Sequence, residues 1–109
     1  MEWKHFSVFS NDVIQKVWEK AETISGLDPQ VFRRDSCSAI IKRNLYRKDN
    51  DPLSMSWQID HIRPIEKGGK EDLNNLQALQ WENNRNKKDN EYFWTCRVCS
   101  NGNENKYCE

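Results

Sequence analysis

The sequence has too few apolar residues for a large core, and its apolar residues are not gathered in long runs. Hydrophobic residues make up 36% of the 109 residues, whereas charged residues make up 31%. No segment approaches the roughly 20 apolar residues of a membrane-spanning helix. The N-terminal ten residues lack the apolar segment of a secretory signal. These absences predict one small domain, residues 1–109, located in the cytoplasm.

A net charge is also absent, because 17 basic residues balance 17 acidic ones. The overall charge therefore gives no indication of a nucleic-acid partner, and such a function must rest on local features. Basic side chains do gather in residues 33–48, which contain six basic residues and one acidic residue. This segment is either an ordinary solvated surface or one that lies beside a phosphate-handling site.

The four cysteines leave two interpretations open. Cys96 and Cys99 have the spacing of a metal-binding pair, and Cys108 and Cys37 complete a set of four thiols for a structural zinc ion. Alternatively, the cysteines are small buried side chains of a C-terminal hairpin. Structural disulfides are not expected, because the sequence shows no secretory signal.

The pattern of apolar and turn-forming residues predicts a mixture of helices and short strands. Apolar residues recur at helical spacing between residues 10 and 25, and Gly26 ends this pattern. Short strands are predicted at 39–41, 57–62 and 76–79, and a helix at 81–90. The strand-like residues from Tyr92 to Cys96 and the Asn101-Gly102 turn predict a C-terminal hairpin over 91–108.

Chemically capable side chains are concentrated in residues 57–88. Asp60 and His61 are adjacent, a Gly-Gly pair follows, Asn75 begins an Asn-Leu-Gln sequence, and Asn84 precedes Lys87 at helical spacing. Each feature alone is ordinary, since such an asparagine often satisfies backbone groups in a turn and such lysines often form a solvated helix face. Their combination is what indicates a functional site.

The combination resembles the HNH endonuclease family, whose pattern is matched by Asp60-His61, Asn75 and Asn84. The resemblance covers residues 57–90. It implies a small α+β domain in which a ββα-metal core is flanked by the N-terminal helix and the C-terminal hairpin. Gln80 and Asn83 stand where many relatives carry zinc-binding cysteines, so the structural zinc of those relatives is not expected around this core.

The resemblance implies a metal-dependent endonuclease acting on nucleic acid, most often DNA. His61 would be the general base, and Asn75 would fix the neighbouring loop or orient His61. Asp60 and Asn84 would bind one Mg²⁺ or Mn²⁺ ion, for which their oxygen atoms are suitable ligands. The phosphates would be bound by basic residues, namely Arg63, Arg85, Lys87, Lys88, Lys42 and Arg43.

Two other classes of function stay open. A catalytically silent module with the HNH fold would bind nucleic acid or protein without cleaving it. A zinc-stapled interaction module would be organised by the cysteines, and it would leave the spacing of Asp60, His61, Asn75 and Asn84 unexplained. A homodimer or a larger nuclease assembly is also compatible with so short a chain.

Overall fold

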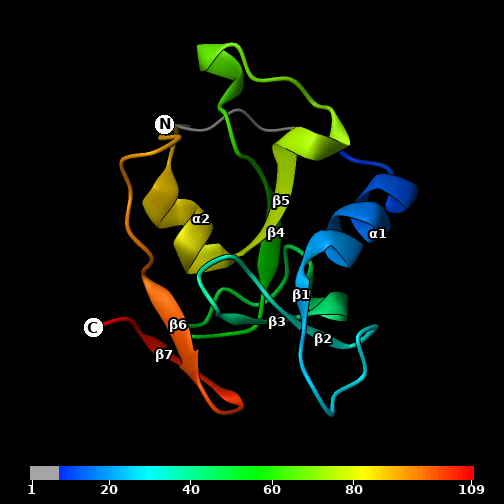
Figure 1. Ribbon diagram of the computed structural model, residues 1–109, viewed down its shortest axis with the longest axis vertical. Coiled ribbons are helices and arrows are strands. Elements are labelled where there is room, and N and C mark those ends of the chain that lie inside the picture. The colour runs from blue at the N-terminus through cyan, green and yellow to red at the C-terminus, as the bar shows by residue number, and fades with distance from the viewer. Residues whose placement is uncertain (1–7) are drawn as a thin grey trace.

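The computed structural model describes residues 8–109, and within them two helices accompany several short antiparallel strands (Figure 1). The α+β class predicted from the sequence is confirmed. The elements are α1 (Asn11–Lys20), β1 (Glu22–Thr23), β2 (Phe32–Arg34), β3 (Ile40–Lys42), β4 (Trp57–His61), β5 (Leu76–Gln80), α2 (Trp81–Lys87), β6 (Val98–Asn101) and β7 (Glu104–Tyr107). The described strands pair as β1–β2–β3, β4–β5 and β6–β7. Neither helix in this part of the chain is long and apolar enough to cross a membrane.

Helix α1 begins where Ser10 caps it, because the Ser10 hydroxyl accepts a hydrogen bond from the Val13 N–H at 3.2 Å. Its apolar side is buried, as the helical spacing of the sequence predicts. The helix ends at Lys20, earlier than the predicted residue 25, because Ala21 adopts an extended backbone and the chain continues into β1.

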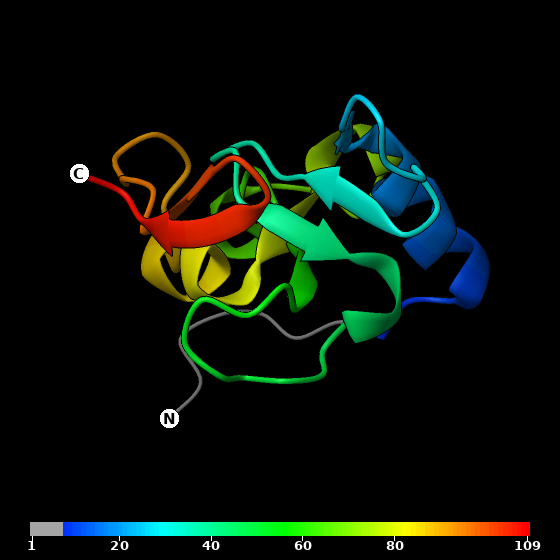
Figure 2. The same cartoon turned by 90° about the horizontal axis from the view of Figure 1, so that it is seen from below.

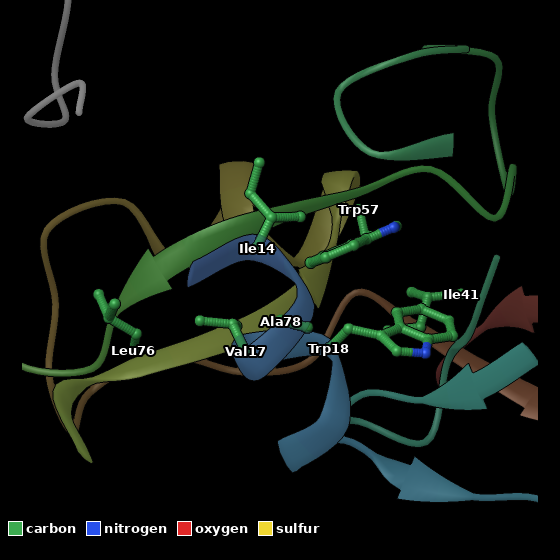
Figure 3. Packing of buried hydrophobic residues seen from close by; sticks show 7 residues of the cluster. All are labelled: Ile14, Val17, Trp18, Ile41, Trp57, Leu76 and Ala78. Atoms are coloured by element: carbon green, nitrogen blue, oxygen red, sulfur yellow. The ribbon is translucent and has the colours of Figure 1, made fainter. Parts of the chain in front are cut away.

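The hydrophobic core lies between α1 and the β4–β5 ladder (Figure 3). The indole rings of Trp18 and Trp57 are tilted against each other with centroids 5.3 Å apart, and both side chains are fully buried. Leu76 and Leu79 of β5 are buried as well. Ile59 and Trp81 are only half-buried. Burial of these large side chains is the main favourable contribution to the fold.

The antiparallel ladder of β4 and β5 is the element that positions the candidate site. Asp60 lies opposite Gln77 and His61 lies opposite Leu76. Helix α1 lies on one side of this ladder and α2 on the other (Figure 1). Since neighbouring residues of a strand point to opposite faces, Asp60 and His61 are directed toward different helices.

A buried hydrogen-bond network around Asp35 joins α2 to the first sheet. One carboxylate oxygen of Asp35 accepts from the backbone N–H groups of Cys37 at 2.9 Å and Ala39 at 2.8 Å. The other accepts from the Gln80 N–H at 2.9 Å and from the Asn83 side-chain amide at 3.0 Å. Burial raises the pKa of Asp35, whereas each of these hydrogen bonds lowers it. Gln80 and Asn83 therefore stabilise the core through hydrogen bonds rather than through a metal ion.

The sequence-based expectation of no disulfides is wrong, and so is the zinc alternative for the four cysteines. Cys37 is bonded to Cys96, and Cys99 is bonded to Cys108. The pairs have Cα–Cα distances of 5.6 Å and 5.1 Å, within the range that a disulfide requires. No free thiol is left among residues 8–109, so Cys96 and Cys99 are not a metal-binding pair.

The C-terminal hairpin is present, but it begins later than the sequence predicts. Its strands are β6 and β7, whereas the segment from Tyr92 to Cys96 is irregular and leaves Tyr92 and Phe93 exposed. The strand prediction for this segment is wrong because β7 pairs with residues 98–101, and Asn86 of α2 binds the Thr95 carbonyl instead. The hairpin lies beside β3 (Figure 2), where the Asn105 side chain exchanges two hydrogen bonds with the Ile40 backbone.

Replacement of Asp35 tests the buried network. Asp35→Asn puts an amide N–H₂ among four donors, so at least one buried donor loses its acceptor. We expect the free energy of unfolding in urea to fall by about 2–3 kcal/mol. The control is Asp12→Asn on the surface of α1, where the side chain is 74% exposed and a change below about 0.5 kcal/mol is expected. Equal effects of the two substitutions would contradict the stabilising role of Asp35.

Candidate functional site

Asp60 forms a buried ion pair with Lys87 on the side of the ladder that faces α2. Their side chains are 0% and 1% exposed, and the Lys87 Nζ lies 3.2 Å from Asp60 Oδ2. The same ammonium lies 3.3 Å from Asp60 Oδ1 and donates to the His61 carbonyl at 3.0 Å. Gln77, the cross-strand neighbour of Asp60, donates to Oδ2 at 2.9 Å. Lys87 and Gln77 therefore fix the position of the Asp60 carboxylate.

Asn84 lies at the same interface between β4 and α2. Gln58 and Asp60 are two residues apart and share one face of β4. The Asn84 side-chain amide donates to Gln58 Oε1. Asn84 and Lys87 are three residues apart on one face of α2, and each contacts this same face of the strand. The fold thus places Asp60 and Asn84 at one interface, although they are far apart in sequence.

His61 lies on the other side of the ladder and forms a separate polar pair with Glu71. The His61 Nε2 is 3.3 Å from Glu71 Oε1, and the imidazole ring lies 6.1 Å from the ring of Phe9. An ionised carboxylate only accepts hydrogen bonds, so Nε2 is the donor in this contact. His61 is 7% exposed, at the end of β4 where the strand leads into the loop 62–75.

Asn75 holds the loop 62–75 closed through its side chain. Asn75 Oδ1 accepts from the Arg63 N–H at 2.9 Å, and Nδ2 donates to the carbonyls of Arg63 at 3.0 Å and Lys70 at 2.7 Å. Gly69 is required in this loop, because a Cβ atom there would lie 1.8 Å from the Arg63 carbonyl oxygen. These contacts of Asn75 fix the loop, which is one of its two predicted roles.

Lys20 supports the same loop from α1. Its ammonium donates to the carbonyl oxygens of Leu73, at 2.6 Å, and of Leu76, on the two sides of Asn75. Burial lowers the pKa of Lys20, because a charged amine loses hydration there. The last residue of α1 is thereby connected to the start of β5.

The predicted phosphate-binding residues do not form one surface. Lys87 is buried in the ion pair, so its prediction as an exposed phosphate-binding cation is wrong. Arg85 and Lys88 are exposed on the outer side of α2, where they line a cleft of about 330 Å³ together with Arg97 and Trp81. Arg97 was not predicted, because it lies beyond the segment that carries the sequence motif.

The basic segment 33–48 is largely used to stabilise the fold. Arg33 is buried and donates to the backbone carbonyls of Pro29, Glu19 and Ala21. Its guanidinium therefore cannot be part of the solvated basic surface that the sequence suggests.

The other three predicted phosphate ligands also have contacts within the fold. Arg43 binds Gln15 at 2.9 Å, and the Lys42 ammonium lies 5.8 Å from the centroid of the Phe32 ring. Arg63 donates to the Lys67 carbonyl at 2.9 Å, and its side chain is 57% exposed. Of these three, only Arg63 lies in the loop 62–75 that follows His61.

Three side chains in contact with the predicted site were missed by the sequence analysis, namely Gln58, Glu71 and Gln77. The hairpin register would have indicated Gln77, because an antiparallel ladder places it directly opposite Asp60. Strand alternation would have indicated Gln58, two residues before Asp60. Glu71 lies in an irregular loop, and no periodic signal predicts its contact with His61.

The side chains at the β4–α2 interface suit a hard divalent cation. Asp60 supplies a carboxylate, and Asn84 and Gln58 supply amide oxygens on the same side, which is the donor type that Mg²⁺ and Mn²⁺ prefer. Residues 8–109 contain no group of three or more His, Cys, Asp or Glu side chains that could hold a metal ion. An ion held there would share the Asp60 carboxylate with the Lys87 ammonium and would keep several water ligands.

Comparison with protein families agrees with this geometry. Residues 47–90 match the HNH endonuclease family model. This HNH match begins ten residues before the predicted core and includes Asp60, His61, Asn75 and Asn84. No curated protein and no solved structure matches the chain. The HNH match indicates a nuclease or a nucleic-acid-binding function, and HNH endonucleases usually use divalent metal ions.

Replacement of Asn75 tests its role in the loop 62–75. Asn75→Ala removes three side-chain hydrogen bonds to the loop backbone, so we expect a loss of about 1–3 kcal/mol in unfolding free energy. The Arg63 amide should also exchange its hydrogen faster, because it loses its acceptor. Asn74→Ala, an exposed neighbour, is the control. Unchanged exchange at Arg63 in the Asn75 variant would contradict loop fixation.

Proposed function

We propose that this protein is a divalent-metal-dependent endonuclease that hydrolyses phosphodiester bonds in DNA. The observation that carries the proposal is that Asp60 and Asn84 both lie at the interface between β4 and α2, with His61 as the next residue of the same strand. This arrangement lies within the region that matches the HNH family. It supplies a hard-cation ligand set on one face of β4 and a proton acceptor on the opposite face, at adjacent positions of the strand.

In this mechanism, His61 removes a proton from the attacking water molecule. Glu71 lies 3.3 Å from the His61 Nε2 atom and holds the imidazole ring in place for this proton transfer. Glu71 then stabilises the imidazolium that forms. Asn75 acts as a positioning residue, since it holds the loop that follows His61.

Asp60 and Asn84 would hold one Mg²⁺ or Mn²⁺ ion, with Gln58 beside them. When bound, such an ion neutralises charge on the phosphoryl group and stabilises the leaving oxygen. Because the ligand set carries a single negative charge, the affinity of the free protein for Mg²⁺ is expected to be weak.

The outer face of α2 is the surface best suited to the DNA backbone. Arg85, Lys88 and Arg97 line one cleft there, and the one acidic residue in its lining, Glu82, accepts hydrogen bonds from Tyr107 and Leu53. Helix α2 carries Asn84 on its inner face, so one short element connects the cleft with the site. Phosphate contacts of this kind give affinity without sequence specificity.

A catalytically silent HNH-fold module is the second candidate. Two observations favour it: the Asp60 carboxylate is held by a buried lysine, and His61 is only 7% exposed. Such a module would keep the basic cleft and bind nucleic acid without cleaving it.

The disulfides also bear on where the protein works. The sequence predicts the cytoplasm, but two disulfides are typical of oxidising compartments, because cytosolic thiols are kept reduced. We therefore favour an oxidising compartment over the cytoplasm. A homodimer or a larger nuclease assembly stays a prediction.

Plasmid cleavage tests the catalytic assignment. The purified wild type should nick or linearise supercoiled DNA in Mg²⁺ or Mn²⁺, and EDTA should abolish the reaction. His61→Ala should lower the rate by about 10²–10⁴-fold, because it removes the general base. Circular dichroism of the variant serves as the folding control. If well-folded wild type binds DNA without cleaving it in either metal, the silent module replaces the nuclease.

Salt dependence tests the DNA-binding cleft. Arg85→Gln should reduce the slope of log affinity against log salt concentration for a short duplex by roughly 0.9, the value for one lost phosphate contact. Fluorescence anisotropy over a range of NaCl concentrations measures this slope. Lys16→Gln removes an equal charge from α1, across the ladder from α2, and should leave the slope unchanged. A slope that responds equally to both substitutions would argue against the cleft.

A further inference from the structure

Lys87 has an environment that its predicted role in DNA binding does not explain. Its side chain is 1% exposed, although lysine is among the residues least often buried. The ammonium has three hydrogens and meets three acceptor atoms, Oδ1 and Oδ2 of Asp60 and the carbonyl oxygen of His61. This complete set of partners indicates a fixed internal position rather than a surface contact.

The partner of Lys87 is the same carboxylate that the proposed function assigns to the metal ion. Both oxygens of Asp60 lie within 3.3 Å of the Lys87 Nζ. The pair is electrically neutral, so the ammonium supplies a positive charge at Asp60 without any metal. A buried carboxylate without such a partner would be strongly destabilising.

From this geometry we propose that Lys87 is a built-in cation of the metal site. It holds Asp60 in place before a divalent ion binds and shares the carboxylate with that ion afterwards. The inference rests on the proposed role of Asp60 as a metal ligand. It makes Lys87 a positioning residue, distinct from the DNA-binding residues Arg85 and Lys88 on the outer face of α2.

The consequence is a low affinity for metal in the absence of nucleic acid. A divalent ion at Asp60 is repelled by the nearby ammonium, and this repulsion is strong because the pair is shielded from water. A phosphate group of the substrate adds negative charge and offsets the repulsion. Metal binding is thereby coupled to substrate binding, so the ion is held firmly only when nucleic acid is present.

Mn²⁺ binding to the full chain, without nucleic acid, tests this proposal. Free Mn²⁺ is measured by electron paramagnetic resonance during titration of the wild type and four variants: Lys87→Gln, Asp60→Asn, Asp60→Asn/Lys87→Gln and Lys88→Gln. The glutamine at position 87 removes the charge and retains a hydrogen-bond donor. The Lys88 variant makes the same change of net charge at the exposed neighbouring position.

Lys87→Gln should bind Mn²⁺ roughly tenfold more tightly than the wild type, or more, because the repulsion is removed. The double variant should bind no better than Asp60→Asn, and Lys88→Gln should resemble the wild type. Equal or weaker binding by Lys87→Gln overturns the proposal, and so does an equal gain from Lys88→Gln.

If Lys87→Gln is too unstable for the titration, its thermal unfolding with and without Mn²⁺ provides a second measurement. Lys87→Gln leaves the buried Asp60 charge without its ion pair, so its melting temperature should rise more on addition of Mn²⁺ than that of the wild type. The neutral double variant should fold and show no such rise. If Lys87→Gln stays unfolded in saturating Mn²⁺ while the double variant folds, the proposal is overturned.

These measurements are independent of cleavage. If Asp60→Asn does not weaken Mn²⁺ binding, Asp60 is not a metal ligand and the proposal for Lys87 fails, whereas plasmid cleavage that depends on His61 would still support the nuclease. If the Mn²⁺ results follow the expectation and no DNA is cleaved, the proposed nuclease activity fails and the role of Lys87 stands.

Discussion

The register of the β4–β5 ladder is the constraint on which the candidate site depends. It places Asp60 opposite Gln77 and His61 opposite Leu76, and strand alternation directs the two site residues to opposite faces. Helix α2 covers one face and α1 the other, so the proposed metal ligands and the proposed proton acceptor have different surroundings. A shift of one residue in this register would exchange the two faces and separate Asp60 from α2.

Short helices and strands in so small a domain need further stabilising interactions. In this structure they are mainly buried hydrogen bonds and disulfides. The Asp35 network joins the first sheet to the start of α2, and the disulfide from Cys37 to Cys96 joins the same turn to the segment before β6. Together they fix α2, which is only seven residues long, against the ladder. The position of Asn84 and Lys87 therefore depends on contacts made well outside the site.

The sequence predicted those parts of the fold in which local pattern and burial agree. The alternation at Trp57 to His61 and the apolar spacing of Ile14, Val17 and Trp18 specify elements that the tertiary structure retains. The prediction from the sequence failed for residues 92–96, because these strand-forming aromatic residues have no strand to pair with and their backbone is irregular. It also failed for Lys87, since helical spacing cannot distinguish the solvated face of a short helix from the face that packs on a carboxylate.

The sequence by itself determined which candidate site residues are present and how they are spaced, namely Asp60, His61, Asn75 and Asn84. The reason is that a sequence motif consists of particular residue types at fixed separations along the chain. Only the tertiary structure decided their partners. Contacts such as Lys87 with Asp60, Glu71 with His61, and Cys37 with Cys96 depend on how distant segments meet in space. They follow from packing between elements, which no local periodicity in the chain specifies.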